Sequence, residues 1–378
     1  MGVSLCEFES HHPHRKEISS EVSFLRFYAY LWGVKTRIMK KTVLVPGGAG
    51  YIGSHVTVEL IESGYDVVIA DNMSNCDETN YRGVCQIVGR EVPFVKMDFC
   101  DAEAVKALFK KYHFDAVIHF AAFKAVGESM TEPLKYYSNN ILSFTNMLQA
   151  ALDAGGCNIL FSSSATVYGE PEKFPVTEAS PRQDATSPYG NTKKMCEDIL
   201  FDSVRAYPTL KGIALRYFNP IGAHPSALIG ELPRGVPNNL VPFITQTAIG
   251  KRESLSVFGN DYPTSDGTCL RDFIDIVDLA KAHVCAVRRM IEGKMEQDYE
   301  IYNIGTGRPL SVMELLNSFI RVSGVKLNWH FAPRRAGDIT AIWADPTLAQ
   351  QKLGWKAERK LDDTLASAWA WEKHLAGK

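Results

Sequence analysis

The sequence has no excess of basic residues and no long run of apolar ones. Its 41 lysines and arginines nearly balance 43 aspartates and glutamates, which leaves a formal net charge of −2 over 378 residues. So balanced a chain lacks the positive surface that attracts nucleic acid. No apolar run is long enough to span a bilayer. We therefore expect neither nucleic acid nor a membrane as a partner.

Metal-binding and disulfide patterns are also missing. The eight cysteines form no C-x-x-C pair, and no cysteine–histidine spacing resembles a zinc site, so no metal is expected. Scattered thiols in a long chain are more typical of a reducing compartment than of a disulfide framework. They predict a cytoplasmic protein.

The first 38 residues differ in composition from the rest. They contain a polar stretch at 11–17 and an aromatic one at 24–34, without the apolar core and cleavage site of a signal peptide. Terminal segments are often disordered unless something ties them down. We expect either a flexible extension over 1–38 or a true start at Met39, where a clean strand begins.

From residue 41 onward, apolar strands alternate with helices. Strands are predicted at the start of 42–64 and at 66–72, 92–99, 115–122, 158–169 and 212–219, and helices before Gly64 and over 102–112 and 136–154. Continuous apolar strands separated by helices indicate a parallel sheet covered on both faces. The predicted fold class is therefore α/β, doubly wound, of the Rossmann type.

After Asn219 the alternation weakens, and loops rich in glycine, proline and asparagine become frequent. A helix over 275–292 and a strand over 299–304 look like further sheet elements. We expect an NAD-binding domain at 39–218. Residues 219–378 would be mainly a smaller α/β lobe that binds substrate and is interleaved with the sheet.

The stretch GGAGYIG carries Gly47, Gly50 and Gly53 between a predicted strand and a predicted helix. Glycines there allow a tight turn and a close approach of backbone N–H groups to a pyrophosphate. Asp71 ends the next strand, where a carboxylate can accept hydrogen bonds from the adenosine ribose. Because that carboxylate would repel a 2′-phosphate, NAD is favoured over NADP.

The stretch SPYGNTK places Tyr189 and Lys193 four residues apart. Ser187 can cap a helix whose first turn accommodates Pro188, so the two side chains would share one face. A second Tyr-x-x-x-Lys, Tyr207 to Lys211, has a proline directly after the tyrosine and is not expected on one helical face.

Longer strings then carry a specific resemblance. They are GGAGYIGSH, VIHFAAFKAVGES, FSSSATVYG, SPYGNTK, LRYFNPIGAHPS, GVPNNL, VFGNDYPTSDGTCLRDFI and APRRAGD. In this order, from about Met39 to the C-terminus, the chain resembles the UDP-galactose 4-epimerases of the extended short-chain dehydrogenase/reductase family. Pro46 departs from the small polar residue that usually precedes the glycines, and residues 1–38 have no counterpart in the compact bacterial form.

The resemblance implies interconversion of UDP-galactose and UDP-glucose in galactose metabolism. The sugar C4 has no acidic hydrogen, so inversion requires oxidation to a ketone by bound NAD, rotation of the 4-keto sugar, and reduction from its other face. Tyr189 would be the base, its pKa lowered by Lys193 and the oxidised nicotinamide. Ser164 would relay the proton, whereas Ser162 and Ser163 are expected to make only strand-end backbone bonds.

The family match assigns the remaining site residues. Those implied for NAD are Gly47, Gly50, Tyr51, Ile52, Gly53, Asp71, Asn72, Asp98, Phe99, Phe120, Ala121, Ala122, Lys124, Asn139, Lys193 and Phe218. Those implied for the UDP-sugar are Ser164, Tyr189, Asn219, Asn239, Leu240, Phe258, Arg271, Arg335, Asp338 and Ile342. Arginines suit this role because planar guanidinium groups match diphosphate oxygens.

Ile342 takes a position where a tyrosine in the family restricts the pocket to glucose and galactose, and a small residue admits N-acetylated sugars. Isoleucine is intermediate, so activity on UDP-GlcNAc and UDP-GalNAc stays open beside simple wall packing.

Three other functions would be compatible with the same fold. A 4,6-dehydratase would need a carboxylate near Ser164, where the chain has Ala165 and Thr166. A pentose epimerase would use the same base, and a non-enzymatic protein on this fold would be free to lose Tyr189 or Lys193. The helices over 102–112 and 136–154 are expected to pair in a homodimer.

Overall fold

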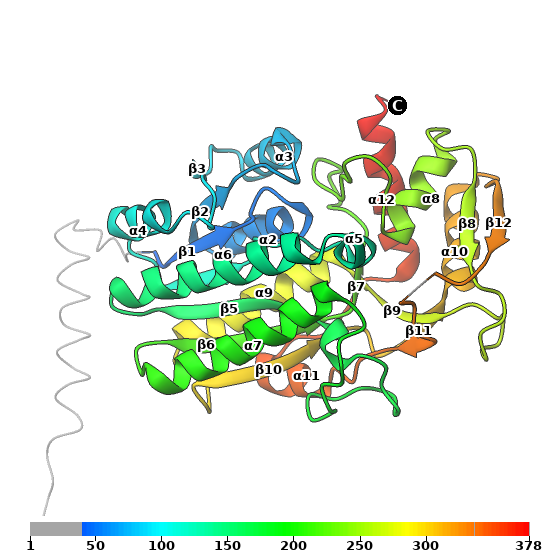
Figure 1. Ribbon diagram of the computed structural model, residues 1–378. Helices are drawn as coiled ribbons and strands as arrows, with labels where there is room; N and C mark the ends of the chain where they lie inside the picture. Colours follow the sequence, from blue (N-terminus) through cyan, green and yellow to red (C-terminus); the bar gives the residue numbers. More distant parts are fainter. Residues whose placement is uncertain (1–39, 336, 378) are drawn as a thin grey trace, which may run out of the picture. The chain divides into compact units, whose positions relative to one another are not determined.

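The computed structural model describes residues 40–335 and 337–377, so the expectations for 1–38 lie outside the described residues. Its main element is a seven-stranded sheet in the order β10–β6–β5–β4–β1–β2–β3 (Figure 1). All neighbouring strands pair in parallel. The strands are β1 (Thr42–Pro46), β2 (Asp66–Asp71), β3 (Phe94–Lys96), β4 (Ala116–His119), β5 (Asn158–Ser164), β6 (Lys211–Tyr217) and β10 (Tyr299–Ile304).

Helices cover both faces of this sheet, which confirms the predicted doubly wound fold. On one face lie α2 (Tyr51–Glu62), α3 (Glu78–Val88), α9 (Ile276–Ile291) and α11 (Thr347–Leu353); on the other lie α4 (Ala102–Lys111), α6 (Pro133–Asp153) and α7 (Pro188–Ala206). Strand β1 contacts both layers of helices, since successive side chains of a strand point to opposite faces of the sheet. Val43 and Val45 pack with α2 and α9, and Leu44 with α4, α6 and α7.

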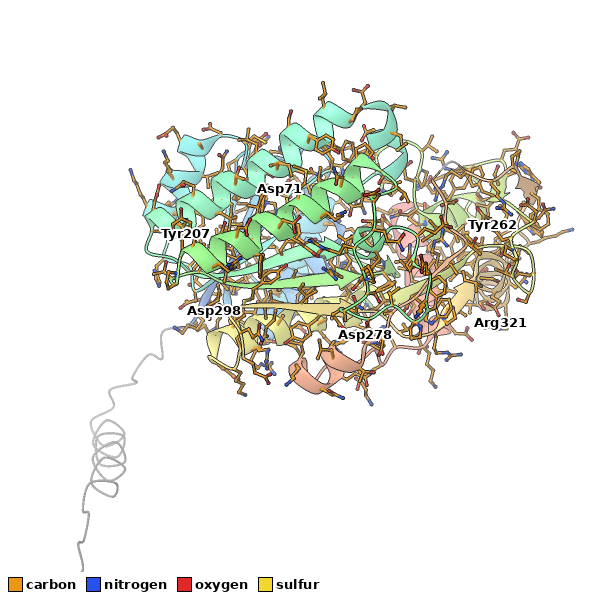
Figure 2. The ribbon with its side chains drawn as sticks, turned by 60° about the horizontal axis from the view of Figure 1, so that its bottom comes forward. Asp71, Tyr207, Tyr262, Asp278, Asp298 and Arg321 are labelled. Atoms are coloured by element: carbon orange, nitrogen blue, oxygen red, sulfur yellow. The ribbon has the colours of Figure 1, made fainter. Side chains whose placement is uncertain are left out.

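A smaller part extends from the carboxyl edge of the sheet. It holds the strands β7 (Asn219–Ile221), β8 (Leu255–Phe258), β9 (Leu270–Asp275), β11 (Pro309–Ser311), β12 (Trp329–Ala332) and β13 (Ala341–Ile342), and the helices α8 (Leu240–Ala248), α10 (Val312–Ser323) and α12 (Leu361–Leu375). Figure 2 shows Tyr262 and Arg321 in this part, at the opposite end of the molecule from Tyr207 and Asp298. A separate apolar cluster stabilises it, with Phe319, Leu316 and Ile244 at its centre.

Several element boundaries differ from the sequence prediction. The strand predicted over 92–99 shrinks to 94–96, and the one predicted over 158–169 ends at Ser164, where a 3-10 helix (Ala165–Tyr168) begins. The helix α6 starts at Pro133 rather than 136, because proline fits the first turn of a helix. Helix α3 was not predicted from the sequence, although Asp77 caps it and Gly89 ends it in the left-handed conformation.

The described helices include none that is both long and apolar enough to cross a membrane. Among the described residues, seven cysteines occur and all are free thiols.

Candidate active site

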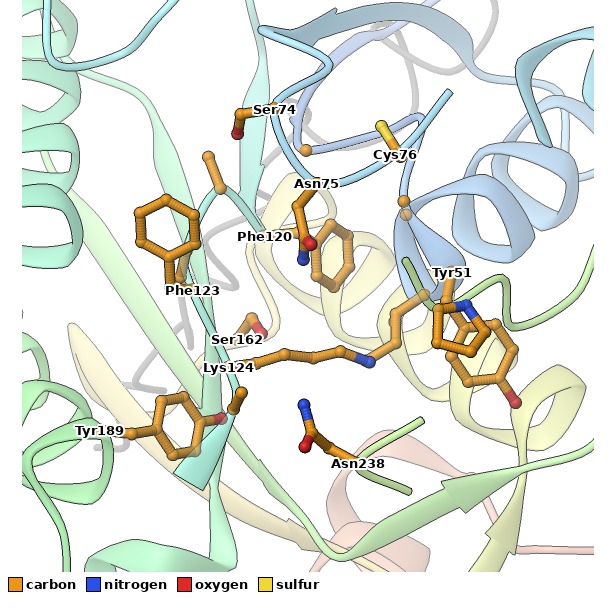
Figure 3. A pocket seen from close by; sticks show the side chains of 18 of the residues that line it. Tyr51, Ser74, Asn75, Cys76, Phe120, Phe123, Lys124, Ser162, Tyr189 and Asn238 are labelled. Atoms are coloured by element: carbon orange, nitrogen blue, oxygen red, sulfur yellow. The ribbon is translucent and has the colours of Figure 1, made fainter. Parts of the chain in front are cut away.

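A cavity of about 540 Å³ opens at the carboxyl edge of the parallel sheet, where β1, β2, β4, β5 and β6 end. Ligands of open α/β sheets bind at this edge. Figure 3 shows Tyr189 on the opposite side of the cavity from Tyr51 and Cys76. The predicted residues that line it are Gly47, Gly50, Tyr51, Ile52, Gly53, Asp71, Asn72, Asp98, Phe99, Phe120, Ala121, Ala122, Lys124, Asn139, Ser164, Tyr189, Lys193, Phe218, Asn219 and Asn239.

The glycine turn between β1 and α2 leaves no room for a side chain at Gly47 or Gly53. Gly47 has a φ of +79°, and a Cβ there would lie 2.9 Å from the backbone nitrogen of Ala121. A Cβ on Gly53 would lie 2.4 Å from the carbonyl oxygen of Gly47. Gly50 precedes α2 without a side-chain cap, so the free N–H groups of the first turn face the cavity edge. This turn therefore fits the pyrophosphate of a dinucleotide.

Asp71 ends β2 at the same edge. Its carboxylate accepts hydrogen bonds from the backbone N–H of Ala49 at 3.2 Å and of Met73 at 2.9 Å, and burial raises its pKa. Asn72 donates to the Asp98 carboxylate at 3.1 Å. These polar groups suit the hydroxyl groups of an adenosine ribose.

The Tyr-x-x-x-Lys pair lies on α7 as predicted. The Ser187 hydroxyl accepts a hydrogen bond from the N–H of Gly190 at 3.2 Å, and Pro188 is the first helical residue. Tyr189 and Lys193 are both buried and line the cavity. The second match separates, because Tyr207 ends α7 and Lys211 begins β6.

The electrostatics of this pair differ from the sequence expectation. Burial raises the pKa of Tyr189 to about 12, opposed by a hydrogen bond with Ser164. Burial lowers the pKa of Lys193 to about 8, and its ammonium donates to the backbone oxygen of Ser162 at 2.6 Å. Lys193 is therefore held by the strand rather than by the tyrosine, and in the protein alone desolvation dominates the pKa of Tyr189.

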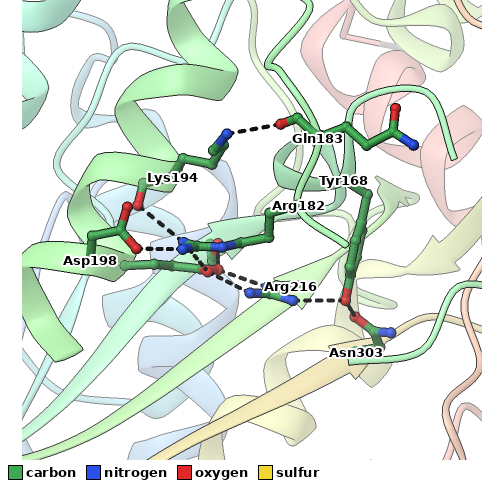
Figure 4. Close-up of polar contacts among 9 residues, drawn as sticks. Tyr168, Arg182, Gln183, Lys194, Asp198, Arg216 and Asn303 are labelled. Carbon is green, nitrogen blue, oxygen red and sulfur yellow. Dashed lines mark hydrogen bonds and ion pairs between the residues drawn. The ribbon is translucent and has the colours of Figure 1, made fainter. Parts of the chain in front are cut away.

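A buried ion pair fixes α7 on the sheet (Figure 4). Arg216 on β6 donates two hydrogen bonds to the carboxylate of Glu197, at 2.9 and 2.6 Å, and both side chains are at most 2% exposed. Ser163 also donates to Glu197, at 2.5 Å. Arg216 further donates to the hydroxyl of Tyr168, which donates to Asn303 at 2.6 Å. The expectation of backbone bonds alone was therefore wrong for Ser163, and also for Ser162, whose hydroxyl bonds that of Tyr217, because only the fold brings these partners together.

Six predicted substrate residues lie apart from the lining of the cavity: Leu240, Phe258, Arg271, Arg335, Asp338 and Ile342. The Asp338 carboxylate pairs with Arg335 at 2.8 Å and with Arg271 at 3.6 Å. The guanidinium of Arg335 lies 5.9 Å from the ring centre of Phe258. Charge-bearing residues far apart in sequence thus gather in the smaller part.

Glu231 lines the cavity and was not identified from the sequence. Its carboxylate accepts hydrogen bonds from Lys124 at 3.1 Å and from Asn239 at 2.6 Å. It connects two residues that the family match assigned to different ligands. Glu231 lies in a loop rich in glycine and proline, so no periodic pattern in the sequence marks its position.

Comparison with known proteins gives matches over most of the chain. The family model described as GDP-mannose 4,6 dehydratase matches residues 44–368. UDP-glucose 4-epimerase of Bacillus subtilis is 49% identical over 330 residues, which is 87% of this chain and 96% of the relative.

Solved structures match over similar lengths. The UDP-glucose 4-epimerase of Bifidobacterium longum, in complex with NAD+ and UDP, is 42% identical with a TM-score of 0.85, covering 88% of this chain and 98% of that one. The UDP-Glc/GlcNAc 4-epimerase of Campylobacter jejuni is 37% identical with a TM-score of 0.75, covering 88% and 99%.

Replacing Glu197 with alanine is expected to destabilise the protein strongly. The change leaves the guanidinium of Arg216 buried without its partner, which costs about 3–5 kcal/mol. Urea unfolding measures the difference. The control is Glu103→Ala on α4, which removes an exposed pair with Lys106 at 3.0 Å and should cost about 0–1 kcal/mol. Equal unfolding midpoints for the two variants would contradict the role given to Glu197.

Proposed function

This chain belongs to the UDP-glucose 4-epimerase family, and from that premise we propose that it interconverts UDP-galactose and UDP-glucose with bound NAD. The observation that carries the proposal is the meeting of Tyr189, Lys193 and Ser164 with the glycine turn in one cavity. The matched family model also covers dehydratases. The 3-10 helix that follows Ser164, Ala165–Tyr168, contains no carboxylate, which favours epimerisation over elimination of water.

Residues along the carboxyl edge of the sheet would hold NAD. The N–H groups at the start of α2 suit its pyrophosphate, and Asp71 suits the adenosine ribose. Lys193 would bind the nicotinamide ribose, with Phe218 beside the ring. When bound, NAD supplies a positively charged group that accepts the hydride from the sugar C4 and returns it to the opposite face.

Tyr189 would move the proton of the C4 hydroxyl. Its phenolate takes that proton as the hydride leaves C4 and gives it back when the hydride returns, so protons and electrons balance over the cycle. Ser164 lies within hydrogen-bond reach of Tyr189 and can pass the proton. Because burial raises the pKa of Tyr189 to about 12, the phenolate needs positive charge beside it. Lys193 at 5.8 Å from the ring centre supplies part of that charge.

The smaller part would bind UDP. Arg271 and Arg335 both pair with the carboxylate of Asp338, which brings their guanidinium groups together where both could bind a diphosphate. Phe258 offers an exposed ring for the uracil side of the nucleotide. Firm contacts to UDP would leave the hexose free to rotate near Tyr189.

Tyr189→Phe should abolish epimerisation. The variant keeps the ring but loses the proton-carrying oxygen, so a fall of about 10²–10⁴-fold in kcat is expected. Protein purified without nucleotide is incubated with UDP-galactose, with and without added NAD, and UDP-glucose is measured. Tyr207→Phe is the control, since Tyr207 is half exposed at the end of α7. No conversion by the wild type with NAD would refute the proposal, and conversion of UDP-xylose alone would favour the pentose alternative.

We also propose activity on UDP-GalNAc, limited by Ile342. This side chain is buried in the same apolar cluster as Phe218, a predicted neighbour of the nicotinamide, so its size would act on the sugar end of the cavity through the packing of that cluster. Ile342→Tyr should reduce UDP-GalNAc turnover about tenfold or more while UDP-galactose turnover changes little. Equal losses with both substrates would indicate a packing defect, and no loss would assign Ile342 to the wall alone.

A cytoplasmic homodimer completes the proposal, with its interface on α4 and α6. Support comes from exposed apolar side chains on two neighbouring helices. They are Leu134 and Leu142 on α6, and Met195 and Phe201 on α7. Light scattering at micromolar concentration should give the mass of two chains, and Leu142→Glu should shift it toward one. The wild-type mass of a single chain would contradict the dimer.

A further inference from the structure

Residues 230–239, named the strap below, cross the cavity between the sheet and the smaller part. The strap follows β7 and ends where α8 begins. Glu231, Leu232, Pro233 and Arg234 line the cavity, as do Ser74 and Cys76 from the turn after β2. The strap and that turn therefore bound one cavity from two segments far apart in the sequence.

Hydrogen bonds fix the start of the strap and link its two ends. The Asn80 side chain on α3 donates to the carbonyl of Gly230 at 3.1 Å and accepts from its N–H at 3.2 Å. Trp371 on α12 donates to the carbonyl of Glu231 at 2.9 Å. At the other end, Asn239 bonds the Glu231 carboxylate across the loop. In the strap's middle, the carbonyl of Gly235 accepts a hydrogen bond from Arg252 at 3.0 Å, and Arg234 makes further contacts.

Arg234 makes those contacts with its guanidinium. It donates to the backbone carbonyls of Ser74 at 2.8 Å, of Met73 at 3.2 Å and of Cys76. In the described structure, these are all the hydrogen bonds between the strap and residues 71–77. Lysine could not reproduce them, because its ammonium is a point donor whereas the guanidinium is a planar fork.

The turn to which Arg234 donates these hydrogen bonds directly follows Asp71. The Asp71 carboxylate accepts the N–H of Met73, and the Asn72 side chain accepts the N–H of Ser74 at 2.9 Å. Met73 itself has a φ of 60°, in the left-handed region that few residues other than glycine adopt. Arg234 therefore binds directly to the segment expected to hold the adenosine ribose.

We propose that Arg234 is a cofactor-retention residue, which closes the strap over the adenosine end of the cavity and slows the escape of NAD. The inference rests on the proposed function. A cofactor that accepts and returns one hydride within a single turnover must not leave between the two steps. Closure by three hydrogen bonds far from Tyr189 serves that need without touching the reacting atoms.

The experiment measures exchange of radiolabelled NAD from full-length protein into an excess of unlabelled NAD. Arg234→Ala should release the label about tenfold faster than the wild type, because lost contacts of this kind act mainly on dissociation rates and the bonds are partly solvated. Arg234→Lys should release it at an intermediate rate. The matched control is Arg82→Ala on the neighbouring α3, whose exposed side chain pairs with Glu78 and with no other described residue, and its release should equal that of the wild type.

Epimerisation separates retention from catalysis. With excess NAD, the initial rate of Arg234→Ala should fall by a smaller factor than its retention of NAD, since Arg234 contacts no reacting group and added cofactor refills the site. Without added NAD it should lose activity during turnover and regain it when NAD is supplied. Release at the wild-type rate in Arg234→Ala would overturn the retention role alone. A wild type that neither binds NAD nor epimerises would overturn the proposed function itself and this inference with it.

Discussion

The buried pair of Glu197 and Arg216 is the contact on which the site depends. It joins α7, which carries the tyrosine and the lysine, to β6, and through Ser163 to β5. Tyr189, Lys193 and Glu197 repeat every four residues on one helical face. Each meets the end of β5: Tyr189 at the hydroxyl of Ser164, Lys193 at the carbonyl of Ser162, and Glu197 at the hydroxyl of Ser163. The register of helix against strand is therefore set residue by residue.

That register has an electrostatic consequence. Placing Tyr189 inside the protein raises its pKa, and placing Lys193 there lowers the pKa of the ammonium, so burial opposes the charged form of each. In the proposed mechanism, Tyr189 would become an effective base only when further positive charge arrives beside it. The ionisation of the tyrosine would then depend on the presence of the oxidised cofactor, whereas in the protein alone the phenol is neutral.

In the proposed function, the two ligands would be held by structures of different kinds. The edge proposed for the cofactor is made of backbone: a glycine turn, a helix N-terminus and strand ends. The region proposed for the nucleotide, in the smaller part, is made of side chains, with two arginines sharing one aspartate. Glu231 bridges the two by bonding Lys124 and Asn239. Rigid backbone suits a cofactor that stays, and exchangeable ion pairs suit a substrate that must enter and leave.

The sequence by itself determined the alternating fold, the glycine turn, the acidic end of β2 and the capped helix with Tyr189 and Lys193, because each is a local pattern of a few residues. The family strings added the remaining assignments, of which the cavity gathers most. Only the tertiary structure revealed Glu197 beside Ser163, Glu231 between Lys124 and Asn239, and Arg234 on the turn after β2. Ser163, Lys124 and Ser74 lie 34, 107 and 160 residues away from these three residues, respectively, and no local period encodes such contacts. Tertiary packing also decided the pKa of Tyr189, since the protein around the phenol, rather than its neighbours in sequence, sets the cost of its charge.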